Sequence, residues 1–261
     1  MNYSFCTRTD PGRARDNNED AVVHDEDTRL CVLADGMGGY NAGEIASGMA
    51  TAFIKSEMTR WLTEAGRHAK IKEIRRALEI CVDNANRSIF NASDSNPQYS
   101  GMGTTLVVGV FHGSTLVLGH IGDSRCYRMR NGELVQITKD HSLLQEQIDA
   151  GLITQEQAAT SSIKNLVTRA LGVEDAVALD LNEHLVEAGD CYMMCSDGLS
   201  DMVDDGEIAS ILGGEPPLEQ KADSLIAAAN DHGGRDNISV LLVQVAAAPG
   251  KRGLISRLLR K

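Results

Sequence analysis

Four aspartates stand where apolar, strand-like runs of this sequence meet glycine. Asp35 and Asp197 each end such a run and are followed directly by glycine. Asp123 ends a third run after a glycine, and Asp236 stands just before a fourth. A carboxylate at a strand end, beside a residue that lets the backbone turn, can join a neighbouring carbonyl oxygen in holding a hard cation. Four such aspartates in one chain predict a shared site.

The donor set indicates the metal and the chemistry. Glu19 and Asp20 add two carboxylates, and Arg15 adds a guanidinium. Oxygen ligands without sulfur or imidazole suit Mg²⁺ or Mn²⁺ rather than Zn²⁺. Several carboxylates in one cleft favour more than one ion, because a single dication would leave net negative charge. Two ions sharing a water lower its pKa from about 16 toward 7, and Arg15 can bind a phosphate with two parallel hydrogen bonds.

Hydrophobic periodicity predicts the elements that must position these residues. Strands are expected within 1–35 and at 105–110, 115–121, 126–130, 134–137, 176–185, 191–195 and 238–245. Helices are expected over 45–62 and 71–89, after Ser142, irregularly over 151–172, and at 204–212 and 216–231. Sequential hairpins with segregated helices predict an α+β fold around one core.

The composition of the chain is that of a globular protein and argues against several other classes of protein. A chain of 261 residues with 42% hydrophobic residues can bury a substantial core. Its net charge of −12 argues against general nucleic-acid binding, which depends on basic surfaces. No apolar run is long enough to span a bilayer, and the start has no signal-peptide pattern, so we expect a cytoplasmic protein. The six cysteines are expected to be reduced and buried.

The spacing of Cys81 and Arg87 fits the signature of a cysteine phosphatase. That interpretation is rejected because both residues lie inside the helical stripe 71–89. A helix interior cannot form the loop of backbone N–H groups that cysteine-phosphatase chemistry needs.

Seven motifs, in this order, resemble those of PP2C-type (PPM) metal-dependent protein phosphatases of the bacterial branch. They are Arg15-x-x-x-Glu19-Asp20, Asp35-Gly36-Met37-Gly38-Gly39, Gly103-Thr104-Thr105, Gly122-Asp123-Ser124-Arg125, Asp140-His141-Ser142, Ser196-Asp197-Gly198 and Asp236-Asn237. The resemblance implies a four-layer α-β-β-α sandwich, with two central antiparallel sheets flanked by helices. It implies a phosphatase domain over 1–247 with a flap at about 142–170, followed by a basic tail, 248–261.

The resemblance also implies roles for individual residues. Asp35 would bridge two Mn²⁺ or Mg²⁺ ions, and the Gly36 carbonyl would contact one of them. Asp197 and Asp236 would complete the first ion. Glu19 would reach the second ion through water.

Further roles follow from the same resemblance. Asp123, with Asp197, would hold a third, weaker ion, and Arg15 would bind the substrate phosphate. Animal members carry histidine, assigned as the general acid, where this chain has Met37. A methionine cannot donate a proton, so a metal-bound water is the preferred donor and His141 a weaker candidate.

The implied activity is hydrolysis of phosphoserine and phosphothreonine in proteins, reversing a cognate Ser/Thr kinase. One alternative is a catalytically silent scaffold of the same fold that binds a regulatory partner, although a silent copy has no need for metal ligands. A two-metal nuclease fits the carboxylates but not the acidic surface.

The chain end, 251–261, is basic and carries leucine and isoleucine at helical spacing. It is interpreted either as a frayed tail or as a short amphipathic helix that contacts a partner or an anionic membrane. A monomer is the default expectation for one compact domain.

Overall fold

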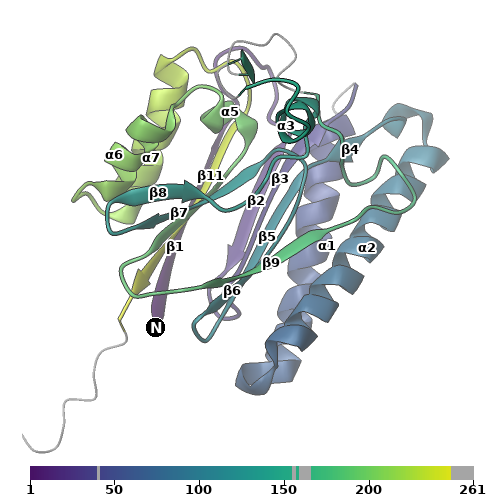
Figure 1. Ribbon diagram of the computed structural model, residues 1–261. Coiled ribbons are helices and arrows are strands. Elements are labelled where there is room, and N and C mark those ends of the chain that lie inside the picture. The colour runs from purple at the N-terminus through teal and green to yellow at the C-terminus, as the bar shows by residue number, and fades with distance from the viewer. Residues whose placement is uncertain (40–41, 155–156, 159–165, 248–261) are drawn as a thin grey trace, which may run out of the picture.

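Two antiparallel sheets stack face to face, and helices cover the outer face of each (Figure 1). The computed structural model describes residues 1–39, 42–154, 157–158 and 166–247. The predicted four-layer sandwich is confirmed. The tail 248–261 and part of the predicted flap lie outside the described residues.

The first sheet contains five strands, in the order β1-β11-β10-β7-β8. Their bounds are Asn2–Asp10 (β1), Ile238–Ala246 (β11), Cys191–Cys195 (β10), Arg125–Arg130 (β7) and Glu133–Gln136 (β8). The Asn131-Gly132 turn joins β7 to β8, with both residues at positive φ, as the sequence pattern predicts for a tight hairpin.

The second sheet has the order β2-β3-β5-β6-β9, and β4 adds to β3. The strand bounds are Asp20–Asp25 (β2), Leu30–Met37 (β3), Gly103–Thr104 (β4), Leu106–His112 (β5), Thr115–Ile121 (β6) and Asp180–Leu185 (β9). The register of β2 against β3 places Asp20 directly opposite Asp35.

The helices lie in two groups. The long helices α1 (Ala42–Ala65) and α2 (Ile71–Ser95) cover the second sheet, and α5 (Asp197–Ser200), α6 (Asp205–Gly213) and α7 (Leu218–Asp231) cover the first. Short α3 (Leu143–Asp149) begins at Ser142, whose hydroxyl accepts the Gln145 N–H as the predicted cap.

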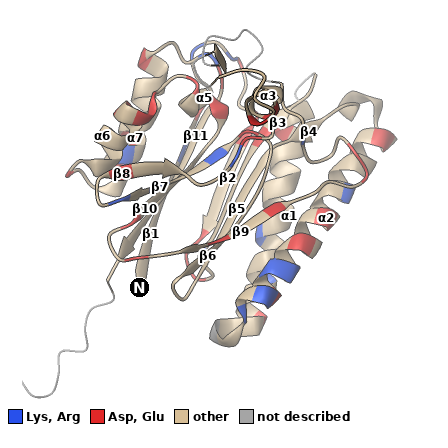
Figure 2. Cartoon of the chain, in the orientation of Figure 1, with Lys and Arg blue, Asp and Glu red and all other residues tan. Residues whose placement is uncertain are grey.

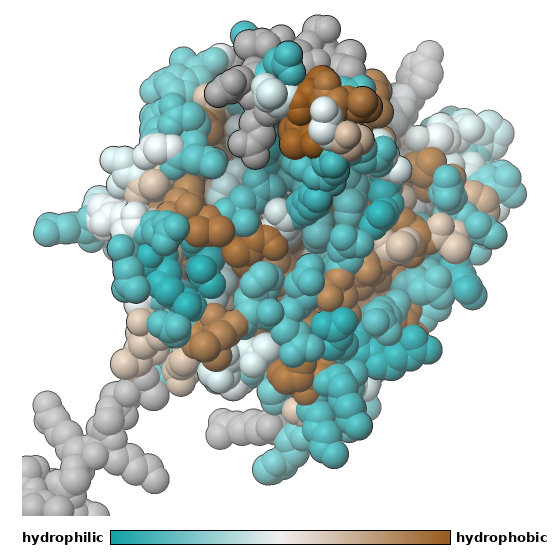
Figure 3. Space-filling view, in the orientation of Figure 1, coloured by the Kyte–Doolittle hydropathy of each residue, from teal (hydrophilic) through white to brown (hydrophobic). Residues whose placement is uncertain are grey.

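Three buried apolar clusters hold the layers together. One lies between α1–α2 and the second sheet, one between the first sheet and α5–α7, and one between the sheets. The cluster between the sheets includes Leu33, Phe111, Tyr192 and Leu241, all at most 1% exposed. The face seen in Figure 3 is mostly hydrophilic, with an apolar group over α3.

Two element predictions are wrong. The helix expected over 151–172 is found at 157–158 but is absent from 151–154 and 166–172. In 166–172, Val167 and Leu171 instead pair with Ser142 and Thr104 as isolated β-bridges. The strand expected from Ala176 begins only at Asp180. Both errors have one cause: contacts with distant segments override the local pattern.

No helix among the described residues is long and apolar enough to cross a membrane. All six cysteines are free and buried, as expected. Acidic residues gather at one end of the two sheets, beside α3 and α5 (Figure 2).

Candidate metal centre

One pocket of about 240 Å³ is lined by the predicted phosphate-binding arginine and all the predicted metal ligands. These are Arg15, Glu19, Asp35, Gly36, Asp123, Asp197 and Asp236; Met37, Gly38, Thr105 and Val167 complete the lining. Residues up to 221 positions apart, Arg15 and Asp236, are in direct contact there. Their roles as ligands remain predictions.

The backbone around Asp35 is held on both sides. Its N–H donates to Thr105 Oγ1 (3.0 Å), and its carbonyl accepts from Thr105 N (2.9 Å) and Thr104 Oγ1 (2.8 Å). Strand β3 therefore presents the Asp35 carboxylate from a fixed backbone, which the two threonines support.

Gly36 is required by close packing. A Cβ at this position would lie 2.1 Å from the Gly43 carbonyl oxygen and 2.6 Å from the Glu19 carbonyl oxygen. The Gly36 N–H also donates to Glu19 O (3.1 Å). A Cβ at Gly43 would lie 2.8 Å from Glu19 Oε2. The start of α1, the end of β3 and Glu19 can meet only because both positions are glycine.

The opposite wall comes from two segments of the first sheet. Asp197 begins α5, with one residue between it and the end of β10, and a Cβ at the adjacent Gly198 would lie 2.1 Å from the Asn237 carbonyl oxygen. Asp236 Oδ2 accepts a hydrogen bond from Arg15 Nη2 at 2.7 Å. The close backbone approach brings Asp197 and Asp236 to the same side of the pocket.

Asn237 fixes the loop that carries Arg15 and Glu19. Its Nδ2 donates to Pro11 O (3.0 Å) and Asn17 O (2.8 Å), and its Oδ1 accepts from Glu19 N (2.8 Å). The sequence analysis gave Asn237 no role of its own. The only signal was its position directly after Asp236.

Asp20 lies beneath the pocket rather than in its lining. Its Oδ2 accepts from Ser196 Oγ (2.7 Å), and Ser196 Oγ in turn accepts from Ser239 N (3.0 Å). Since Asp20 belongs to one sheet and Ser196 follows a strand of the other, this bond joins the two sheets under Asp35. The sequence predicted that Asp20 points into the site, and the structure places it behind the lining.

The carboxylates raise one another's pKa. Burial, followed by repulsion from Asp20, Asp197, Asp123 and Asp236, holds the pKa of Asp35 well above its ordinary value. Burial and the neighbouring acids raise the pKa of Asp197 in the same way. Burial raises the pKa of Asp123 to about 6 and that of Asp20 to about 7. An oxygen-only donor set with uncompensated negative charge fits divalent cations, which would offset the repulsion.

Asp201 is an acidic residue that sequence reasoning missed. It lies one helical turn after Asp197, and its charge raises the pKa of both Asp197 and Asp123. The spacing of four residues from Asp197 was the available signal.

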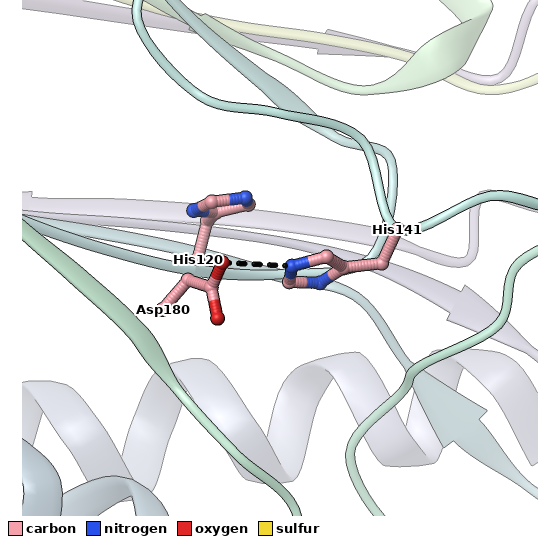
Figure 4. Close-up of side chains that lie close together, drawn as sticks. All are labelled: His120, His141 and Asp180. Atoms are coloured by element: carbon pink, nitrogen blue, oxygen red, sulfur yellow. Dashed lines mark ion pairs between the residues drawn. The ribbon is translucent and has the colours of Figure 1, made fainter. Parts of the chain in front are cut away.

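His141 lies outside the pocket lining, in a cluster with His120 and Asp180 (Figure 4). The Gly122 N–H donates to His141 Nδ1 (3.1 Å), so the ring proton is on Nε2, which faces Asp180 Oδ2 at 3.3 Å. Both ring nitrogens are thus engaged. This geometry argues against His141 as the general acid and makes it a support for the Gly122–Asp123 turn.

The same cluster has the residue types of a zinc site, but its geometry argues against one. The rings of His120 and His141 are stacked, with centroids 4.7 Å apart and planes inclined by 15°. A metal must lie near the plane of each imidazole that binds it, which two stacked rings cannot satisfy at one point. Arg169 Nη1 also lies 2.8 Å from Asp180 Oδ1 and supplies the positive charge there.

Replacing His141 with phenylalanine is expected to lower the free energy of unfolding by about 1–3 kcal/mol, because the buried Gly122 N–H loses its acceptor. His141→Asn, which offers an acceptor oxygen, is expected to lose less stability than His141→Phe.

The contribution of His141 to stability should depend on pH. Burial, then the charge of His120, lowers the pKa of His141. The unfolded chain therefore binds more protons, and this part of the stability is lost as pH falls below about 6.5. Urea unfolding of the wild type and both variants between pH 8 and 5.5 measures the loss of stability and its dependence on pH. Equal stability of His141→Phe and wild type would contradict it.

Comparison with known proteins identifies the family. Residues 13–242 match the model of the family described as protein phosphatase 2C. The chain is 40% identical over 243 residues to serine/threonine phosphatase stp of Listeria monocytogenes, covering 91% of this chain and 94% of that protein. It is 36% identical over 240 residues to protein phosphatase PhpP of Streptococcus pneumoniae, covering 91% and 95%.

Solved structures agree with this result. The serine/threonine phosphatase PstP/Ppp of Mycobacterium tuberculosis is similar with a TM-score of 0.87 and 38% identity, over 95% of this chain and all of that chain (100%). The catalytic domain of PstP in complex with 2 manganese ions is similar with a TM-score of 0.81 and 39% identity, over 94% and 99%. On its sequence motifs, its fold and these matches, the chain belongs to the protein phosphatase 2C family.

Proposed function

We propose that this protein hydrolyses phosphoserine and phosphothreonine in other proteins with the help of divalent cations. The observation that carries the proposal is the single pocket in which Arg15 lies beside the acidic side chains of Glu19, Asp35, Asp123, Asp197 and Asp236. A guanidinium and a divalent-cation site in one pocket form a receptor for a phosphate dianion.

The ligands would divide among the ions as follows. Asp35 would bridge two Mn²⁺ or Mg²⁺ ions, with the Gly36 carbonyl on one. Asp197 and Asp236 would complete one ion, and Glu19 would hold the other through water. When bound, the ions supply a water of lowered pKa and positive charge beside the phosphate.

A third ion is proposed between Asp123 and Asp197. Its binding is expected to be weaker than that of the other two ions, as the family resemblance implies. Manganese is favoured by the manganese complex of the related PstP, and magnesium has the same preference for oxygen ligands.

Arg15 would orient the phosphate for attack. Its side chain is 51% exposed and bonds to Asp236 through Nη2 alone. The guanidinium carries five N–H donors, so it can contact Asp236 and still offer hydrogen bonds to phosphate oxygens. Because Met37 carries no proton and His141 faces away from the pocket, we propose that water in the pocket protonates the leaving serine or threonine oxygen.

Replacing Arg15 with alanine is expected to lower kcat/KM for a phosphothreonine peptide by about 10–100-fold, mainly through KM, because charge-assisted hydrogen bonds to the phosphate are lost. Arg15→Lys keeps the positive charge but not the planar guanidinium, so its kcat/KM should lie between those of Arg15→Ala and wild type. Arg13→Ala removes an exposed arginine outside the pocket and serves as the matched control. Steady-state phosphate release measures all four proteins, and equal losses in Arg13→Ala would contradict the assignment.

The physiological setting is proposed from the same activity. The substrates are phosphoproteins made by a Ser/Thr kinase, in a cytoplasmic signalling pathway, and the enzyme acts as a monomer with its phosphatase domain over 1–247. The tail 248–261 is proposed to contact a partner or a membrane. Deleting 250–261 without any change in localisation or partner binding would remove the tail proposal.

The direct test is phosphate release from a phosphothreonine peptide in Mn²⁺, beside bis(p-nitrophenyl) phosphate as a diester. Hydrolysis of the peptide and not of the diester is expected. Hydrolysis of neither would favour the silent-scaffold alternative, and hydrolysis of the diester alone would favour a phosphodiesterase.

A further inference from the structure

A second pocket, of about 370 Å³, adjoins the candidate metal centre. The two pockets share Met37 and Val167 in their linings. The lining of the second pocket is otherwise largely apolar, with Val173, Ala176, Val177 and Ala178 beside Met37 and Val167. The pocket therefore lies between the end of the predicted flap, which contributes 167–170, and the segment 173–178 that follows it.

The wall formed by 172–175 is held rigidly from α2. Asn86 of α2 is fully buried, and its Oδ1 accepts from Gly172 N at 2.7 Å. Its Nδ2 donates to Glu174 O (3.0 Å) and Asp175 O (3.2 Å). Three hydrogen bonds from one buried side chain shape this segment before any ligand binds, which reduces the entropy lost on binding.

Gly103 allows this wall to approach the metal centre. A Cβ there would lie 2.8 Å from Val173 Cγ2 and 3.7 Å from Met37 Cγ. Val173 and Met37 therefore flank the bare Gly103 backbone. Val173 is nevertheless 54% exposed, so it presents its side chain to anything that enters the second pocket.

The second pocket is also lined by two charged residues, Arg169 and Glu174, which differ in whether they are free to meet a ligand. Arg169 Nη1 contacts Asp180 Oδ1 (2.8 Å) and donates to Ala178 O (3.2 Å), so its charge is paired within the protein. Glu174 lines the same pocket and is exposed. Among the described residues that line this pocket, Arg169 is the only cation, and its charge is already paired, so an acidic ligand would meet the Glu174 carboxylate without a free cation from these residues to offset it.

We propose that this pocket binds an apolar side chain of the substrate immediately beside the phosphorylated residue. The inference rests on the proposed function. Because the two pockets share Met37 and Val167, a peptide whose phosphate lies between Arg15 and Asp35 has a neighbouring residue beside this shared wall, within reach of the second pocket. Apolar lining, a fixed wall and an exposed Glu174 favour leucine or methionine there and disfavour aspartate and glutamate.

The test compares phosphothreonine peptides that differ only in the neighbouring residue, on each side in turn: leucine, glutamate or lysine. On the side that reaches the pocket, wild-type kcat/KM is expected to be about tenfold higher for leucine than for glutamate. Val173→Lys should reverse this preference toward glutamate, and Val173→Asp should favour lysine. Each value is divided by kcat/KM for p-nitrophenyl phosphate, which has no neighbouring residue, so a general loss of active enzyme cancels.

The matched control is Leu185→Lys. Leu185 is 62% exposed, lies on β9 and does not line the pocket, so the leucine-to-glutamate ratio should stay at the wild-type value. Equal wild-type kcat/KM for leucine and glutamate on both sides, or equal ratios in wild type and Val173→Lys, would overturn the pocket assignment while leaving the phosphatase activity intact. Failure of the wild type to hydrolyse any of these substrates would instead overturn the proposed function, and the pocket assignment with it.

Discussion

Replacing Asp35 with asparagine is expected to lower kcat/KM for a phosphothreonine peptide by at least about 10³-fold. Asparagine keeps the shape of the side chain but removes the charge that would bridge two cations. The backbone that presents Asp35 is held by Thr104 and Thr105 and is unaffected by the change. Phosphate release in saturating Mn²⁺ measures the loss, and wild-type activity in Asp35→Asn would refute the proposed site.

A second measurement separates loss of metal binding from misfolding. Because burial and neighbouring acids raise the pKa of Asp35, removing its carboxylate should leave the metal-free protein at least as stable as wild type near pH 8. Mn²⁺ at 100 times its dissociation constant stabilises a protein by about 2.7 kcal/mol, so thermal unfolding should shift upward in wild type and far less in Asp35→Asn. Asp223→Asn, at an exposed site outside the pocket, should behave as wild type in both assays.

Chelation of the metal is expected to reduce hydrolysis to the buffer background, and excess Mn²⁺ should restore it. The physical reason is that the carboxylates of the pocket lining repel both one another and a phosphate dianion unless divalent cations offset their charge. Assays with EDTA, then with added Mn²⁺ or Mg²⁺, measure the effect. Full activity in EDTA would contradict a metal-dependent mechanism.

Chelation should also change how stability depends on pH. The pKa is raised to about 6 for Asp123 and about 7 for Asp20, and well above its ordinary value for Asp35 and Asp197. The native metal-free protein therefore holds more protons than the unfolded chain, and its stability falls as pH rises above about 4. Bound Mn²⁺ offsets this repulsion, so the stability gained from Mn²⁺ should be larger at pH 8 than at pH 5.5. A gain independent of pH would count against cations among these carboxylates.

Patterns in the sequence were enough to predict most of the residues that line the pocket and the architecture that brings them together. Asp35, Asp123 and Asp197 could be recognised because each stands at a strand end beside glycine, a purely local pattern. The stripes 45–62 and 71–89 predicted α1 and α2 because helical periodicity is also local. Ordered motifs over nearly the whole chain then indicated the sandwich.

Contacts between segments distant in sequence could not be predicted and are seen only in the folded protein. That His141 accepts from Gly122, and that Asp20 pairs with Ser196 beneath the pocket, depends on how separate segments pack. One wall of the second pocket likewise depends on Asn86 of α2, which fixes the 172–175 segment between the expected helix 151–172 and the expected strand 176–185. Side-chain orientation and loop shape follow from the sum of such long-range contacts, and no local spacing encodes them.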